Sequence, residues 1–146
     1  MKNRWIVLAL IVISLCIGAF LYVSTRSESI YLNQWLSMIN NGELILYFQK
    51  LVTNVQIPEI IIYSLPDGLW MFAMIMVILM IWDFRLHKRS MIWLFSAIGA
   101  GISFEFLQSM QIVRGTFDKM DLLLILVCAI LPITFILIKF RKYQTV

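Results

Sequence analysis

The sequence predicts an all-α integral membrane protein, a four-transmembrane-helix bundle with short amphipathic interfacial helices in its first outer loop. Composition is one reason, because 62% of the 146 residues are apolar and only 14% are charged. So small a chain cannot bury that much apolar surface in a soluble core. The other reason is that the apolar residues fall into four nearly uncharged runs, each close to the about 20 residues that cross a bilayer. We expect a single membrane domain over residues 1–146.

The first spanning helix is expected over residues 5–23, directly after the basic residues Lys2 and Arg4. A signal peptide is the alternative, since it also combines a basic start with an apolar run. However, this run exceeds the about 15 residues of a signal-peptide core, and no clear small-residue cleavage site follows it. The pattern favours a retained anchor.

Residues 24–64 are expected to form an outer loop at the membrane surface. Apolar residues recur at helical spacing around Trp35 and again around Phe48, which predicts two short amphipathic helices. A re-entrant lid over the bundle is the alternative. Residues 60–63 are expected to be extended or to dip into the membrane.

The second spanning helix is expected over residues 65–82, with Ser64 as its cap and with Pro66 and Asp67 in its first turn. A capping role alone would account for Asp67. The third helix is expected over residues 91–107.

The third helix carries small residues, among them Ala97 and Gly101, on the face that continues to Glu105 and Gln108. Small residues allow helices in a bilayer to approach closely, so this face should pack into the bundle. The fourth spanning helix is expected over residues 120–138.

The basic residues predict the orientation, because Lys and Arg are retained on the cytoplasmic side of short loops. Both termini and the connection between the second and third helices carry most of them: Lys2, Arg4, Arg85, Lys88, Arg89, Lys139, Arg141 and Lys142. The two outer loops carry the others: Arg26, Lys50, Arg114 and Lys119. Both termini should therefore be cytoplasmic. This topology explains the net charge of +4 without nucleic acid as a partner.

One polar constellation stands out in the outer half of the predicted bundle. Asp67 lies about 22 Å from the inner end of its helix and Glu105 about 21 Å from the inner end of the next, so the two carboxylates share a depth. Antiparallel packing of these helices would bring them together. The constellation is completed by polar residues that follow in the sequence: Gln108, Arg114, Asp118 at the rim, and Asp121.

Two interpretations of this constellation remain open. In the structural one, Glu105 and Arg114 form an ion pair and Asp121 caps the fourth helix. In the functional one, these residues line an outward-facing pocket, because ionisable groups inside a membrane mark functional sites. Glu105 and Asp121 are then the candidate catalytic groups. The candidate ligand-binding residues are Asp67, Gln108, Arg114 and Asp118.

The chemistry of such a pocket suits several ligands. Arg114 can clamp a phosphate or carboxylate, and the carboxylates can hold a hard divalent cation or accept protons from hydroxyl or amine groups. The single histidine, His87, is expected on the opposite side of the membrane, which argues against a catalytic zinc. No cofactor and no specific metal site is assigned from the sequence.

The order of these polar residues is informative: Glu105, Gln108, Arg114 and then Asp121 opening the last helix. This pattern resembles the VanZ-like family of small bacterial integral membrane proteins, which is associated with teicoplanin resistance. The resemblance covers roughly residues 67–131. It implies a multi-pass protein of the bacterial inner membrane that binds or modifies an envelope lipid or cell-wall precursor. Trp70 stands where the family carries a histidine, so histidine-dependent chemistry is not implied.

Two other classes of function remain as alternatives. A small proton-coupled transporter or channel would use Glu105 and would need several copies of the chain to enclose a pathway. A structural or assembly subunit would use the small-residue face and the outer loop to bind a membrane-protein partner. The lipid bilayer is the partner that all three share.

Overall fold

The computed structural model describes residues 2–25, 38, 42–53, 56–113 and 117–140. The regular elements in these ranges are all α-helical, which confirms the all-α part of the expected fold class. The helices are α1 (Lys2–Thr25), α3 (Glu43–Thr53), α4 (Glu59–Tyr63), α5 (Leu65–Ile81), α6 (Lys88–Ser109) and α7 (Lys119–Phe140).

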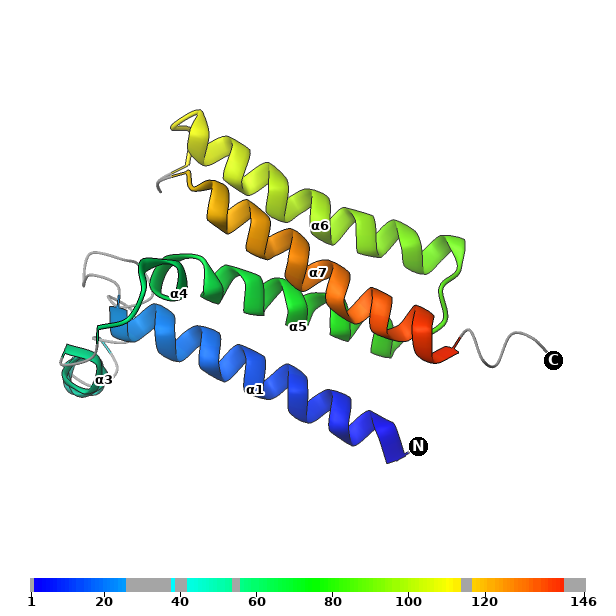
Figure 1. The fold of residues 1–146 in the computed structure, drawn as a ribbon, viewed down its shortest axis with the longest axis horizontal. Helices are drawn as coiled ribbons and strands as arrows, with labels where there is room; N and C mark the ends of the chain where they lie inside the picture. The colour runs from blue at the N-terminus through cyan, green and yellow to red at the C-terminus, as the bar shows by residue number, and fades with distance from the viewer. Residues whose placement is uncertain (1, 26–37, 39–41, 54–55, 114–116, 141–146) are drawn as a thin grey trace.

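The four long helices α1, α5, α6 and α7 run side by side (Figure 1). Helix α5 is central, because it packs against α1 on one side and against α7 and α6 on the other. The start of α1, the end of α7 and the α5–α6 connection lie at one end of the bundle. The opposite end carries α3, α4 and the α6–α7 turn. The α6–α7 end is where the polar residues singled out in the sequence gather.

The core follows from the central place of α5. A cluster of buried apolar side chains fills the space between α5, α6 and α7: Met71, Ile75, Leu79, Leu94, Ile125 and Ala129. A smaller cluster of Ile11, Ala73 and Met76 joins α1 to the opposite face of α5. Arg4 and Asp83 form an ion pair that ties the start of α1 to the α5–α6 connection. Both side chains are more than half exposed, so this pair adds little stability.

Two glycines let the helices approach α5 closely. A Cβ atom at Gly18 of α1 would lie 2.7 Å from the indole nitrogen of Trp70. A Cβ atom at Gly68 of α5 would lie 3.0 Å from the sulfur of Cys128 and 3.3 Å from the carbonyl oxygen of Leu124, both in α7. Helices α5 and α7 are therefore in close contact beside Asp67.

The segment before α5 corrects two expectations. Residues 60–63 are helical within α4 rather than extended, because Pro58 is pre-set for a helix start and its carbonyl accepts hydrogen bonds from the amides of Ile61 and Ile62 at 2.9 and 3.3 Å. Ser64 has helical backbone angles and links α4 to α5, and its side chain makes no capping hydrogen bond.

Part of the segment between α1 and α5 forms a helix that its periodicity predicts. Helix α3 covers the expected amphipathic run around Phe48 and contacts α1, with Phe20 and Phe48 packed edge to face at 5.5 Å. The helix expected around Trp35 lies outside the described residues.

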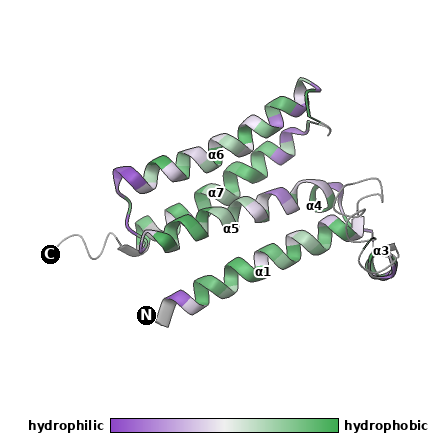
Figure 2. Cartoon of the chain, turned by 180° about the vertical axis from the view of Figure 1, so that it is seen from behind, coloured by the Kyte–Doolittle hydropathy of each residue, from purple (hydrophilic) through white to green (hydrophobic). Residues whose placement is uncertain are grey.

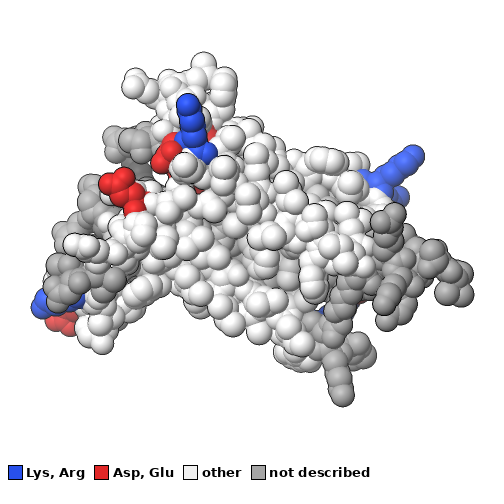
Figure 3. All heavy atoms as spheres, in the orientation of Figure 1, with Lys and Arg blue, Asp and Glu red and all other residues white. Residues whose placement is uncertain are grey.

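The surface of the bundle is apolar, and several polar side chains are buried. Bulky groups such as Trp93 and Phe106 of α6 are 60% and 62% exposed. Hydrophobic colour extends along α1, α5 and α7, and charged atoms lie toward the two ends of the face in view (Figures 2 and 3). Two described helices, Arg4–Thr25 and Lys88–Ser109, are long and apolar enough to cross a membrane, and Leu65–Ile81 is a shorter apolar helix. The set of four spans stays a prediction.

Helix α6 begins at Lys88, before the apolar run that the sequence suggested, because a capping box holds its first turn. The His87 amide donates to the hydroxyl oxygen of Ser90 at 2.9 Å, and the buried Ser90 hydroxyl also lies 3.1 Å from the Arg85 carbonyl. His87 itself is exposed at the end opposite the polar constellation.

We expect Ser90→Ala to lower the free energy of unfolding by about 1 kcal/mol, because it removes the capping hydrogen bond. Thermal unfolding of the purified protein in detergent measures this loss. Ser109→Ala is the matched control, since Ser109 is an exposed serine at the other end of α6. Equal effects of the two substitutions would contradict the capping role of Ser90.

Candidate functional site

A pocket of about 660 Å³ opens at the end of the bundle where α6 ends and α7 begins. Its walls come mainly from α5, α6 and α7, and Tyr22 of α1 and Tyr63 of α4 complete them. The lining includes five residues of the predicted constellation: Asp67, Gln108, Asp118, Glu105 and Asp121. The sixth, Arg114, lies outside the described residues, so its predicted ion pair with Glu105 stays a prediction.

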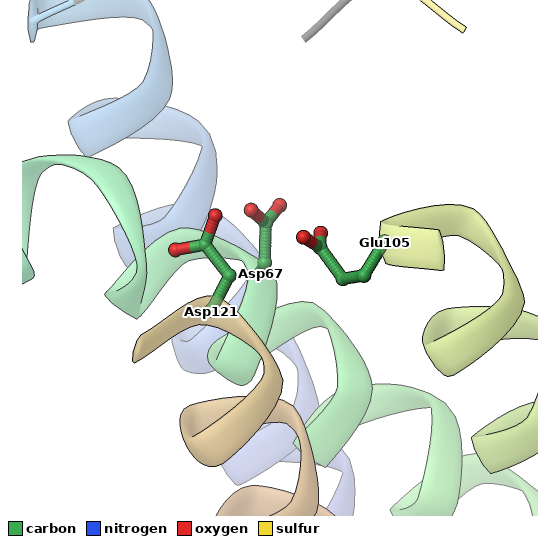
Figure 4. Close-up of side chains that lie close together, drawn as sticks. All are labelled: Asp67, Glu105 and Asp121. Carbon is green, nitrogen blue, oxygen red and sulfur yellow. The ribbon is translucent and has the colours of Figure 1, made fainter. Parts of the chain in front are cut away.

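Three carboxylates meet in this pocket, one from each of three helices (Figure 4). Asp67 comes from α5, Glu105 from α6 and Asp121 from α7, and one oxygen of each lies within 4.8 Å of the others. This confirms the expected proximity of Asp67 and Glu105. Asp121, which the sequence also predicted to line the pocket, lies beside them.

The cluster is largely shielded from solvent. Glu105 is 3% exposed and Asp121 is 6% exposed, while Asp67 is partly buried. The Oδ1 atom of Asp121 has no hydrogen-bond partner among the described residues. Two unit charges about 4 Å apart repel by about 4 kcal/mol at an effective dielectric constant near 20. Three negative charges this close together therefore favour binding of a cation or of a positively charged ligand group.

The start of α7 explains why Asp121 points inward. Asp118 precedes the helix, and its Oδ1 accepts a hydrogen bond from the Met120 amide at 2.9 Å, so Asp118 is the capping residue. Asp121 then falls on the buried face of the first turn. The structural interpretation, in which Asp121 caps the helix, is therefore wrong in this respect.

The helix ends favour two of the three acids. Asp67 and Asp121 lie in the first turns of α5 and α7, where the partial positive charge of a helix N-terminus stabilises a carboxylate. Glu105 lies near the C-terminal end of α6, where the helix dipole offers no such stabilisation. Glu105 is thus the carboxylate with the least support from the backbone.

The pocket changes character along its length. The acids and Gln108 lie at the end of the pocket next to the α6–α7 turn, whereas Met74 and Ala97 also line it. Met74 lies about 10 Å from Asp67 along α5, and Ala97 lies about 12 Å from Glu105 along α6. The pocket is therefore polar near the α6–α7 turn and apolar toward the middle of the bundle.

Aromatic wall residues were not among those predicted for the site. Tyr22, Tyr63 and Trp70 line the pocket, and the rings of Tyr22 and Trp70 lie 5.4 Å apart. The sequence signal for Trp70 was its spacing from Asp67, which places it one helical turn deeper on the same face. Tyr22 carries no such signal, because only the packing of α1 against α5 brings it here.

Searches of family models, curated proteins and solved structures found no match to this chain. The geometry and chemistry of the pocket therefore carry the functional argument.

Proposed function

We propose that the protein is a multi-pass inner-membrane protein of the VanZ-like kind, with α1, α5, α6 and α7 as its spans. Its pocket faces outward and binds the head group of an envelope lipid or lipid-linked cell-wall precursor. The exposed apolar side chains along the long helices and the buried acids between them support a bilayer setting.

Charge supports the orientation. Among the described residues, the end opposite the pocket carries Arg4, Arg85, Lys88 and Arg89, and the pocket end carries Lys50 and Lys119. Basic residues concentrate on the cytoplasmic side of membrane proteins, so the pocket would open outward. Both termini would then be cytoplasmic.

The observation that carries the proposal is the amphipathic lining. A pocket that is polar at one end and apolar along the rest matches a ligand that has a polar head and a hydrocarbon tail. The three acids would accept hydrogen bonds from hydroxyl or amine groups of the head, and Gln108 would orient it. Arg114, which the sequence places close by, would bind an anionic part of the same molecule.

The arrangement favours binding over turnover. Glu105 and Asp121 can accept a proton, but the single histidine, His87, lies at the opposite end of the bundle and cannot activate a nucleophile here. Release or presentation of the bound lipid, rather than a covalent change, would then be the protein's contribution.

Filling the apolar part of the pocket tests this proposal. We expect Ala100→Phe to weaken binding of a lipid-linked cell-wall precursor at least tenfold, roughly the effect of losing 1.4 kcal/mol of contacts, because Ala100 lines the pocket. Native mass spectrometry of the detergent-solubilised protein measures the bound fraction, with a phospholipid as competitor.

The control is Gly99→Leu on the neighbouring position of α6, where an added Cβ meets nothing within 4 Å. This variant should bind like the wild type. If both variants bind equally well, or if the precursor binds no better than the phospholipid, the proposed function is wrong.

A further inference from the structure

We propose that the acidic cluster of Asp67, Glu105 and Asp121 is a binding site for a hard divalent cation, with Ca²⁺ as the best fit to its spacing. This inference goes beyond lipid binding, because it requires only these three side chains. It holds whatever molecule occupies the rest of the pocket.

The spacing of the ligand atoms fits such an ion. Oxygens on opposite sides of Ca²⁺ lie about 4.8 Å apart, twice the usual Ca–O distance of about 2.4 Å. One oxygen from each acid lies within 4.8 Å of the other two, so all three reach a common centre without rearrangement of the helices. Mg²⁺, with opposite oxygens about 4.1 Å apart, would require the side chains to close in slightly.

A second observation also indicates a cation at this site. Asp121 is 94% buried, since its exposed fraction is 6%, and its Oδ1 has no hydrogen-bond partner among the described residues. Figure 4 shows its carboxylate beside that of Asp67, with Glu105 directed at the same space. A buried carboxylate oxygen without a donor is costly, and a cation at the centre of the cluster removes that cost.

The donor set selects the class of ion. All three ligands are carboxylates, which suit Ca²⁺, Mg²⁺ and Mn²⁺ rather than softer metals. Three carboxylates around a divalent ion leave the site with one negative charge, in place of three. The pocket leaves space for water or a ligand oxygen to complete the coordination shell.

Trp70 provides a direct test, because it lines the same pocket and can transfer excitation to a bound lanthanide. We expect Tb³⁺, added to the purified protein in detergent without lipid, to give saturable luminescence on tryptophan excitation. Excess Ca²⁺ should displace it. Trp70→Phe should abolish most of this emission, which assigns the signal to the pocket rather than to Trp82 beside Asp83.

Asp121→Asn should weaken Ca²⁺ competition at least tenfold, because even indirect partners of metal ligands contribute tenfold or more. Glu59→Gln, which removes an exposed carboxylate of α4, should leave the affinity unchanged. The proposal fails if wild type shows no saturable emission that Ca²⁺ displaces. It also fails if Glu59→Gln and Asp121→Asn weaken binding equally, since binding would then be diffuse. Lipid-free conditions keep this outcome separate from the lipid-binding test.

Discussion

Gly68→Leu is expected to lower the free energy of unfolding by about 3 kcal/mol, the upper part of the range for overpacked cores. The added Cβ would meet the Leu124 carbonyl oxygen at 3.3 Å and the Cys128 sulfur at 3.0 Å. A backbone oxygen in a helix cannot rotate away, so α5 and α7 must separate. Thermal or chemical unfolding in detergent, followed by intrinsic fluorescence, measures the loss.

The separation of α5 and α7 should also disturb the pocket. Gly68 follows Asp67 directly, and Asp121 lies on α7, the opposing helix. Gly68→Leu should therefore impair binding in the pocket as well as stability. Gly99→Leu introduces the same side chain where the space is open, so it should not lower stability and should raise it by up to about 1 kcal/mol through higher helix propensity. A Gly68→Leu protein as stable as Gly99→Leu would show that α5 and α7 are not closely packed.

Much of the helical layout could be predicted because the apolar runs are long and uninterrupted. The run at residues 65–82 corresponds to α5 (Leu65–Ile81), and the run at residues 120–138 corresponds to α7 (Lys119–Phe140). The greater length of α6 could not be read from hydropathy. Its first turn contains Lys88 and Arg89, which an apolar criterion rejects but which the capping box around His87 keeps helical.

The site was partly predictable for a related reason. Asp67 and Glu105 share a depth, and depth follows from the rise of a helix, so their meeting could be derived from two positions in the chain. Whether Asp121 lines the pocket or caps α7 could not be derived in this way. Whether Asp118 or Asp121 caps α7 depends on where the chain leaves the α6–α7 turn, and both are good capping residues. Once Asp118 takes the cap, Asp121 falls on the buried face.

The final prediction concerns the repulsion among the three carboxylates of the cluster. In the presence of a chelator, we expect Glu105→Gln to be more stable than wild type by about 1–3 kcal/mol. The substitution keeps the size of the side chain and removes one of three carboxylates within 4.8 Å of each other. Glu105 takes part in two of the three pairs, and each fully charged pair about 4 Å apart repels by about 4 kcal/mol at an effective dielectric constant near 20, so the expected gain lies well below the upper limit.

Glu105→Gln should give a larger gain in stability than Asp121→Asn, because the helix dipole stabilises the carboxylate of Asp121 and not that of Glu105. Unfolding in detergent compares both variants with Glu59→Gln, which changes an exposed carboxylate and should match wild type. Adding Ca²⁺ should then reverse the order, since wild type gains stability from the bound ion and the variant does not. A loss of several kcal/mol in Glu105→Gln would instead mean that Glu105 is half of a structural ion pair. Arg114 would be its expected partner, because a buried cation left without its anion is strongly destabilising.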